Sequence, residues 1–141
     1  MILVDTSVII TYLKGTRSEA CHQFQSVINL NLPFGINHYI YLEVLQSSRT
    51  PNEYDQLKEY LGTQKFYFLR HEKESFEQAA KLYMKCRTKG ITIRSTLDML
   101  IVQTAIENEV MLLHDDRDYD KIAGIEKKLR IFDTKFIRRP K

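Results

Sequence analysis

Two short aliphatic runs, each followed by aspartate, decide the predicted fold: Ile2-Leu3-Val4-Asp5-Thr6-Ser7 and Val110-Met111-Leu112-Leu113-His114-Asp115-Asp116. Apolar runs of this length are typical of strands that are buried on both faces of a parallel sheet. Further strands are predicted at 33–36, 65–69 and 129–132. The chain therefore begins and nearly ends with strands of a buried sheet.

Helical patterns separate these strands along the chain. Helices are predicted where apolar residues recur at helical spacing and where a cap residue or Pro51 marks a start. Strands that alternate with helices predict an α/β sandwich around a mostly parallel sheet. The predicted helices cover 7–14, 18–29, 38–48, 51–61, 74–89, 95–108 and 118–123.

The composition fits one soluble domain over 1–141. Of the 141 residues, 43% are hydrophobic and 28% charged, which is enough for a core without disulfides. Cys21 and Cys86 are too few for a disulfide framework, which favours a reducing, cytoplasmic location. No apolar run approaches the ~20 residues that span a bilayer, and no secretory signal is evident, so no membrane association is expected. The net charge of +3 is compatible with a nucleic-acid partner without establishing one.

Aspartates follow both of the clearest strands. Asp5 comes directly after the run at 2–4, and Asp116 ends the turn after the run at 110–114. In open α/β sheets, functional sites form outside the carboxyl ends of the strands, so both carboxylates are candidates for one site. Each also has an ordinary alternative role, because Asp is favoured in Asx turns and at helix N-caps.

Two more carboxylates could join them. Glu43 falls in an apolar helical stripe, where a carboxylate is costly unless it is paired or binds metal; the alternative is a rotated stripe that turns Glu43 to solvent. Asp98 lies in the first turn of a predicted helix and could instead form a capping box with Ser95. Carboxylates without His or Cys suit Mg²⁺ or Mn²⁺ rather than zinc. One or two such ions can activate water and neutralise a phosphodiester.

Four segments carry a family resemblance: MILVDTS at 1–7, YLEV at 41–44, LDMLIVQTA at 97–105 and LLHDDRDYDKIA at 112–123. In this order they resemble the PIN-domain ribonucleases, and most closely the VapC type, which is the toxin of a toxin–antitoxin pair. The match spans nearly the whole chain. It implies an α/β/α sandwich with a mostly parallel central sheet, and metal-dependent endonucleolytic cleavage of RNA.

The resemblance also assigns roles to the acidic residues and their neighbours. The family's acidic quartet, which binds Mg²⁺ or Mn²⁺ and carries catalysis, falls on Asp5, Glu43, Asp98 and Asp116. Its hydroxyl after the first Asp falls on Thr6 or Ser7. The motif often has Asn where this chain has Asp115, which leaves open whether Asp115 or Asp116 reaches the metal; Asp118 is a further candidate. A homodimer and a cognate antitoxin, whose tail enters the active-site groove, are implied as well.

Basic and aromatic residues near the predicted loops could contact RNA. The basic tail at 134–141 could add nonspecific attraction to phosphates. His114, beside the acids, is expected to be structural rather than catalytic. Tyrosines could stack on bases, although such residues more often belong to a core or a dimer interface. The candidates for phosphate contacts are Lys14, Arg49, Arg94 and Arg117, and those for stacking are Tyr12, Tyr39 and Tyr119.

Three other functions fit parts of the pattern. The chain could be a PIN-domain RNA-processing nuclease outside toxin–antitoxin systems, although it has no inserted or accessory domain. It could be a catalytically silent RNA-binding regulatory partner, although all four acids are present. A phosphoacceptor switch domain would place its acid pair after the first strand, whereas Asp115 and Asp116 follow the last long one. The expected function is therefore a VapC-type toxin that hydrolyses RNA phosphodiester bonds with metal-activated water.

Overall fold

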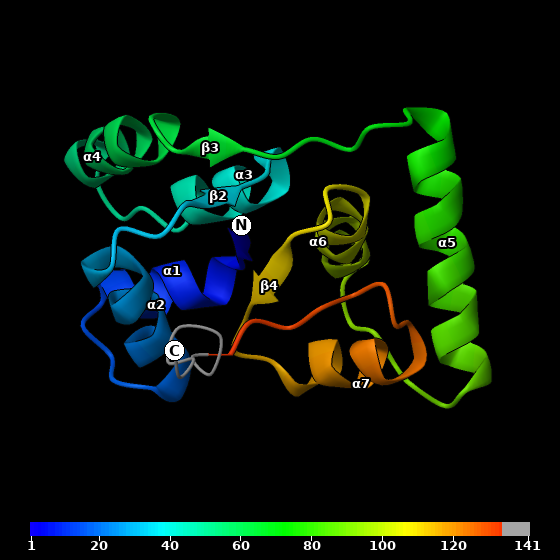
Figure 1. The fold of residues 1–141 in the computed structure, drawn as a ribbon. Helices are drawn as coiled ribbons and strands as arrows, with labels where there is room; N and C mark the ends of the chain where they lie inside the picture. The colour runs from blue at the N-terminus through cyan, green and yellow to red at the C-terminus, as the bar shows by residue number, and fades with distance from the viewer. Residues whose placement is uncertain (134–141) are drawn as a thin grey trace.

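The computed structural model describes residues 1–133, and four short strands form a parallel sheet at its centre (Figure 1). The strands lie in the order β3-β2-β1-β4, and all three neighbouring pairs are parallel. Because β1 is flanked by β2 and β4, its carboxyl end lies between two other strand ends. The strands are β1 (Ile2–Val4), β2 (Phe34–Ile36), β3 (Lys65–Phe66) and β4 (Met111–Leu113).

Seven helices surround the sheet in the described part of the chain. Figure 1 shows α1 and α2 on one side of the sheet and α5 and α6 on the other, while α3 and α4 form a hairpin beside β2 and β3. This arrangement is the α/β/α sandwich that the sequence predicts. The helices are α1 (Thr6–Leu13), α2 (Glu19–Asn29), α3 (His38–Gln46), α4 (Pro51–Gly62), α5 (Lys73–Thr88), α6 (Thr96–Glu107) and α7 (Arg117–Ile125).

Polar cap residues fix where the helices begin. The hydroxyls of Ser18, Thr50 and Ser95 each accept a hydrogen bond from a backbone N–H in the first turn of the helix that follows. Asn37 accepts from the N–H of Ile40 and also donates to the hydroxyl of Thr104, which joins the start of α3 to α6. These caps explain why the predicted helix starts agree closely with the observed ones.

The buried apolar side chains form one cluster around β1 and β4. Leu3, Val4 and Leu112 are completely buried, as expected for strands covered on both faces. Gly35 permits β2 and β3 to approach closely, because a Cβ at this position would lie 2.5 Å from the carbonyl oxygen of Lys65. Cys21 and Cys86 are buried free thiols, in agreement with the absence of a predicted disulfide framework.

Two strand predictions require correction. The strand predicted at 65–69 ends at Phe66: Tyr67 still donates its N–H to the carbonyl of Ile36, and then the chain turns away toward α5 with Phe68 exposed. The strand predicted at 129–132 is wrong. Only an isolated parallel bridge between Leu112 and Ile131 forms: the N–H of Leu112 donates to the carbonyl of Arg130, and the N–H of Phe132 donates to the carbonyl of Leu112.

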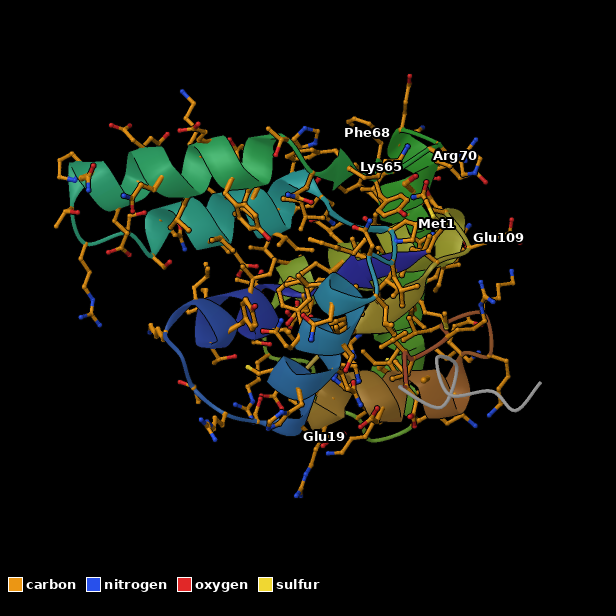
Figure 2. All side chains as sticks on the ribbon, turned by 60° about the vertical axis from the view of Figure 1, so that its left-hand side comes forward. Met1, Glu19, Lys65, Phe68, Arg70 and Glu109 are labelled. Carbon is orange, nitrogen blue, oxygen red and sulfur yellow. The ribbon has the colours of Figure 1, made fainter. Side chains whose placement is uncertain are left out.

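The amino ends of the strands gather at one edge of the sheet, as parallel pairing requires. Figure 2 shows Met1, Lys65 and Glu109, which precede or begin β1, β3 and β4, on the same side of the molecule. The carboxyl ends therefore meet at the opposite edge. No helix within residues 1–133 is long and apolar enough to cross a bilayer. The predicted basic tail at 134–141 lies outside the described residues.

Candidate active site

Asp5 stands at the carboxyl end of β1, in the middle of the sheet. Its backbone N–H donates to the carbonyl of Leu113 at 2.9 Å, so the turn after β1 is tied to the end of β4. The side chain is buried, with 5% of its surface exposed. Its Oδ2 accepts hydrogen bonds from the N–H and the hydroxyl of Ser7, at 3.3 and 2.8 Å, and so caps α1. The predicted capping role is therefore confirmed, and the other oxygen, Oδ1, remains for a second partner.

That second partner is the hydroxyl of Tyr119, which also joins Asp98 to the site. The Tyr119 hydroxyl lies 3.0 Å from Oδ1 of Asp5 and 3.1 Å from Oδ1 of Asp98. Ser95 caps α6 through the N–H of Leu97, and the Asp98 carboxylate turns to Tyr119 rather than completing a capping box. Residues 5 and 98, far apart in the sequence, thus share one donor.

Glu43 approaches from α3 and is held by α1. The side chain is half-buried, and its Oε1 accepts a hydrogen bond of 2.7 Å from the hydroxyl of Thr6. The two predicted accessory hydroxyls, Thr6 and Ser7, therefore orient two different carboxylates. Ser7 orients Asp5, and Thr6 orients Glu43.

The turn after β4 contributes Asp116. Its Oδ1 accepts from the N–H of Asp118 at 2.9 Å and caps α7, which confirms the predicted capping role. Asp115 is exposed, whereas Asp118 is half-buried with an Oδ2 atom that has no hydrogen-bond partner among the described residues. His114 accepts from the Asp116 N–H through Nδ1, and its Nε2 lies 3.0 Å from Asp120, so it orders the turn.

The charges of the other three carboxylates reach Asp98. Burial raises the pKa of Asp98 to about 6; the hydrogen bond from Tyr119 opposes this, and the negative charges of Asp5, Asp116 and Glu43 add to the rise. Burial and the charges of Asp5 and Asp98 also raise the pKa of Tyr119 well above its usual value, so its hydroxyl remains a donor. Asp116 is therefore the residue of the 114–120 turn whose charge reaches Asp98.

The donor set fits a hard divalent cation. All four side chains offer carboxylate oxygens, and the ion pairs seen among the described residues, Lys73–Glu77 and His114–Asp120, leave the four without a cationic partner. As they stand, no three acidic, His or Cys side chains within residues 1–133 form a group that could hold a metal ion. Without a cation, repulsion between the negative charges opposes a closer approach of the carboxylates. A bound cation would replace this repulsion with attraction.

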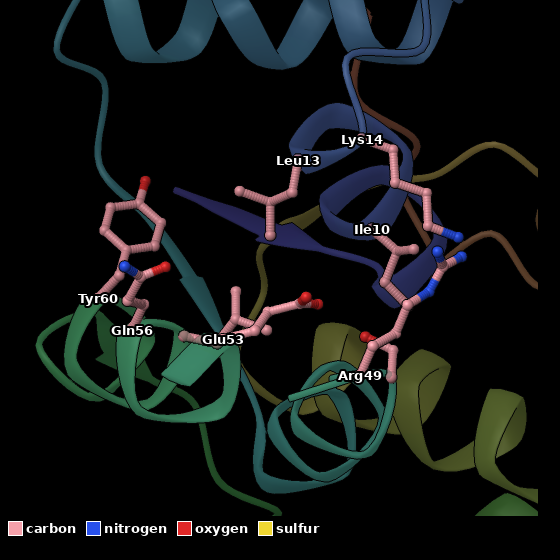
Figure 3. A pocket seen from close by; sticks show the side chains of 9 residues that line it. Ile10, Leu13, Lys14, Arg49, Glu53, Gln56 and Tyr60 are labelled. Atoms are coloured by element: carbon pink, nitrogen blue, oxygen red, sulfur yellow. The ribbon is translucent and has the colours of Figure 1, made fainter. Parts of the chain in front are cut away.

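The predicted cations fall into two groups. Arg94 and Arg117 are both exposed. Arg94 directly precedes Ser95, the N-cap of α6, and Arg117 directly follows Asp116, the N-cap of α7. Lys14 and Arg49 instead line a pocket of about 510 Å³ between α1 and the α3–α4 hairpin, where Figure 3 shows them at one side. Only the first group neighbours the carboxylates along the chain.

Of the two roles predicted for Tyr119, stacking on a base or packing in the core, the structure shows the core role. Its side chain is 2% exposed and points into the carboxylate cluster, so no base can reach the ring. Tyr12 packs edge-on against Phe24 and donates to Gln25, and Tyr39 is half-buried against the core. The link between Asp5 and Asp98 through a tyrosine was not predicted. The available signal was a tyrosine in the first turn of a helix that follows a strand-end aspartate.

Comparisons with known proteins agree with this architecture. Related proteins include the VapC ribonuclease Mb1587 of Mycobacterium bovis and the ribonuclease VapC11 of Mycobacterium tuberculosis. Each is 29% identical to this chain over 126 residues, which is 89% of the chain and 93% of the relative.

Solved structures show the same fold at low sequence identity. A Rickettsia felis VapBC2 complex bound to a promoter DNA fragment has a TM-score of 0.68 at 15% identity and covers 94% of this chain and 98% of its own. The FitAcB structure from Neisseria gonorrhoeae has a TM-score of 0.68 at 18% identity, covering 94% and 97%. A toxin–antitoxin complex from Klebsiella pneumoniae has a TM-score of 0.66 at 18% identity, covering 93% and 100%.

The family model described as the PIN domain matches residues 2–125, which include the sheet and all four acidic residues. The fold of its structural neighbours is the fold described above. The chain belongs to the PIN domain family.

Proposed function

We propose that this chain is a divalent-metal-dependent endoribonuclease of the VapC type, the toxin component of a toxin–antitoxin pair. The observation that carries the proposal is the set of four carboxylates that interact at the carboxyl edge of the sheet without a cationic partner among the described residues. The relatives named as ribonucleases extend over 89% of the chain. An acidic, hydroxyl-buttressed site of this kind suits phosphodiester hydrolysis.

Within this proposal, the metal ligands are Asp5, Glu43, Asp98 and Asp116. A bound Mg²⁺ or Mn²⁺ supplies activated water at neutral pH and offsets the charge of the phosphate. The protein holds Asp5 through Ser7 and Tyr119 and holds Glu43 through Thr6.

The remaining accessory residues have narrower roles. Exposed Arg94 and Arg117 attract the phosphates that flank the cleaved bond. We do not include Asp115 among the direct metal ligands, because its side chain is exposed. Asp118 is half-buried in the first turn of α7 and is a further candidate ligand.

Cleavage assays on purified protein test this proposal. The unchanged chain should cut RNA in the presence of Mn²⁺ and leave 5′-phosphate and 3′-hydroxyl ends. Cleavage should stop when EDTA is added. Asp5→Asn and Asp98→Asn should each lose cleavage while keeping the fold by circular dichroism. Asp55→Asn, an exposed acid on α4, is the matched control and should stay active. Cleavage that persists in both site variants, or in EDTA, would contradict the proposal.

Besides the tail expected in the active-site groove, we propose that the antitoxin contacts the pocket between α1 and the α3–α4 hairpin. Its lining combines exposed apolar side chains, Leu13 and Tyr60, with the charges of Lys14 and Arg49 (Figure 3). An antitoxin segment with apolar and acidic side chains complements Leu13, Tyr60, Lys14 and Arg49 in this lining, which also contains the acidic Glu53. Arg49→Glu should weaken a cognate antitoxin in a titration without altering RNA cleavage by the free toxin, and unchanged affinity would argue against this surface.

The proposal includes a homodimer in the cytoplasm. Phe76 and Met84 lie two turns apart on α5, and they are 47% and 56% exposed. Exposed apolar side chains on one helical stripe are typical of a protein–protein contact. Sedimentation of Phe76→Glu should show a monomer where the unchanged chain shows a dimer. If the unchanged chain sediments as a monomer, the proposed homodimer is wrong.

A further inference from the structure

Tyr119 occupies an unusual position for a tyrosine in a core. It lies on α7, is 2% exposed, and packs its ring 5.1 Å from the His114 ring, measured between centroids. Its hydroxyl does not reach solvent. Instead, it reaches Oδ1 of Asp5 at 3.0 Å and Oδ1 of Asp98 at 3.1 Å.

The two acceptors come from different parts of the fold. Asp5 caps α1 after β1, and Asp98 stands in the first turn of α6. The separation of their Oδ1 atoms cannot exceed the sum of the two hydrogen-bond distances. A hydroxyl has one proton, which can serve either carboxylate, so it lowers the cost of holding two anions together. The hydrogen bonds of Ser7 and Thr6 each orient one carboxylate, whereas Tyr119 joins two.

We propose that Tyr119 is a positioning residue of the metal centre, whose hydroxyl holds the Asp5 and Asp98 carboxylates at the separation that one divalent ion requires. The inference rests on the proposed function, because it takes these two residues as metal ligands. The geometry leaves oxygens to bind the ion: Oδ2 of Asp98 has no hydrogen-bond partner among the described residues, and Oδ1 of Asp5 keeps a second lone pair.

A different role for the Tyr119 hydroxyl would have the opposite effect on metal affinity. If Tyr119 merely occupied the oxygens that a metal needs, its removal would tighten metal binding. If it orients them, its removal weakens binding, because outer-sphere hydrogen bonds fix ligand geometry and their loss typically costs about 10–100-fold in metal affinity. Metal affinity therefore separates the two roles.

The test is to measure Mn²⁺ binding to the full chain in the absence of RNA, by isothermal titration calorimetry and by electron paramagnetic resonance of Mn²⁺. Tyr119→Phe keeps the ring that fills the core and removes only the hydroxyl. The matched control is Tyr67→Phe: Tyr67 is also buried, its hydroxyl has no partner in the described part of the chain, and it lines a different pocket, with Met1, Lys65 and Phe68, which contains none of the four acids.

The expected result is a dissociation constant for Mn²⁺ about tenfold higher in Tyr119→Phe and unchanged in Tyr67→Phe. RNA cleavage by Tyr119→Phe should recover at saturating Mn²⁺ with an unchanged KM for RNA, which a general loss of structure would not produce. Unchanged or tighter Mn²⁺ binding in Tyr119→Phe would overturn this inference alone. No Mn²⁺ binding by the unchanged chain would overturn the proposed function and this inference together.

Discussion

Replacing Asp98 with Asn should make the metal-free protein more stable at neutral pH. In the folded chain the pKa of Asp98 is raised from 3.8 to about 6, first by burial and then by the charges of Asp5, Asp116 and Glu43. One unit corresponds to about 1.4 kcal/mol, so the ionised carboxylate costs the folded state at most about 3 kcal/mol. Asp98 is only half-buried, and solvent screening reduces the expected gain to about 1–2 kcal/mol.

The sign of the pH dependence follows from the raised pKa. Protonation of Asp98 stabilises the folded chain. This stabilisation is fully present below the pKa of the unfolded chain, 3.8, and is lost as the pH rises through the pKa of the folded chain, about 6. The advantage of Asp98→Asn should therefore be largest at pH 7.5 and should shrink as the pH falls to 4.5. Urea unfolding in EDTA, followed by circular dichroism, measures both free energies.

Asp55→Asn, on the exposed face of α4, is the control for the loss of a surface charge. It should change the free energy of unfolding by less than about 0.5 kcal/mol at either pH. An Asp98→Asn variant that is no more stable than the unchanged chain at pH 7.5, or whose gain grows as the pH falls, would refute the argument that the ionised Asp98 carboxylate destabilises the folded chain.

Three further predictions address the metal, the sheet and the substrate. Mn²⁺ at about 100 times its Kd should stabilise the unchanged chain by about 2.7 kcal/mol, and thermal unfolding of Asp5→Asn should show much less of this gain; an equal gain would place the ion elsewhere. Gly35→Ala should cost at least about 2 kcal/mol in urea unfolding, because the new Cβ meets the Lys65 carbonyl oxygen at 2.5 Å; a neutral change would show that β2 and β3 can separate freely. Arg117→Ala should lower the slope of log affinity for RNA against log salt by about 0.7 without changing Mn²⁺ binding, and an unchanged slope would exclude Arg117 from phosphate contact.

Much of the fold could be predicted because its local signals agree with its packing. The strands at β1 and β4 are aliphatic runs that are buried on both faces, and Ser18, Thr50 and Ser95 cap helices where predicted. The segment 129–132 has a similar apolar composition and its Leu129 and Phe132 are buried, but it pairs with β4 only around Leu112 and does not extend into a strand. Tertiary position, rather than local propensity, decided this segment.

The candidate site could be predicted only in part. The strand-end aspartates follow from sheet topology, and the structure brings the charges of Asp5, Glu43 and Asp116 to bear on Asp98. Both strand-end aspartates also cap helices, so the ordinary and functional roles coexist. Tyr119 was assigned to stacking or to the core, because a tyrosine has no sequence feature that shows where its hydroxyl points. That information depends on how α7 packs against the ends of β1 and α6.

The location of a bound ion tests the central claim most directly. Crystals of the full chain grown with Mn²⁺ should show an anomalous diffraction peak at the carboxyl edge of the sheet, within about 2.0–2.5 Å of carboxylate oxygens of Asp5 and Asp98. This peak should disappear in Asp5→Asn crystals. A peak elsewhere on the molecule, or none at Mn²⁺ concentrations that support RNA cleavage, would contradict the central claim.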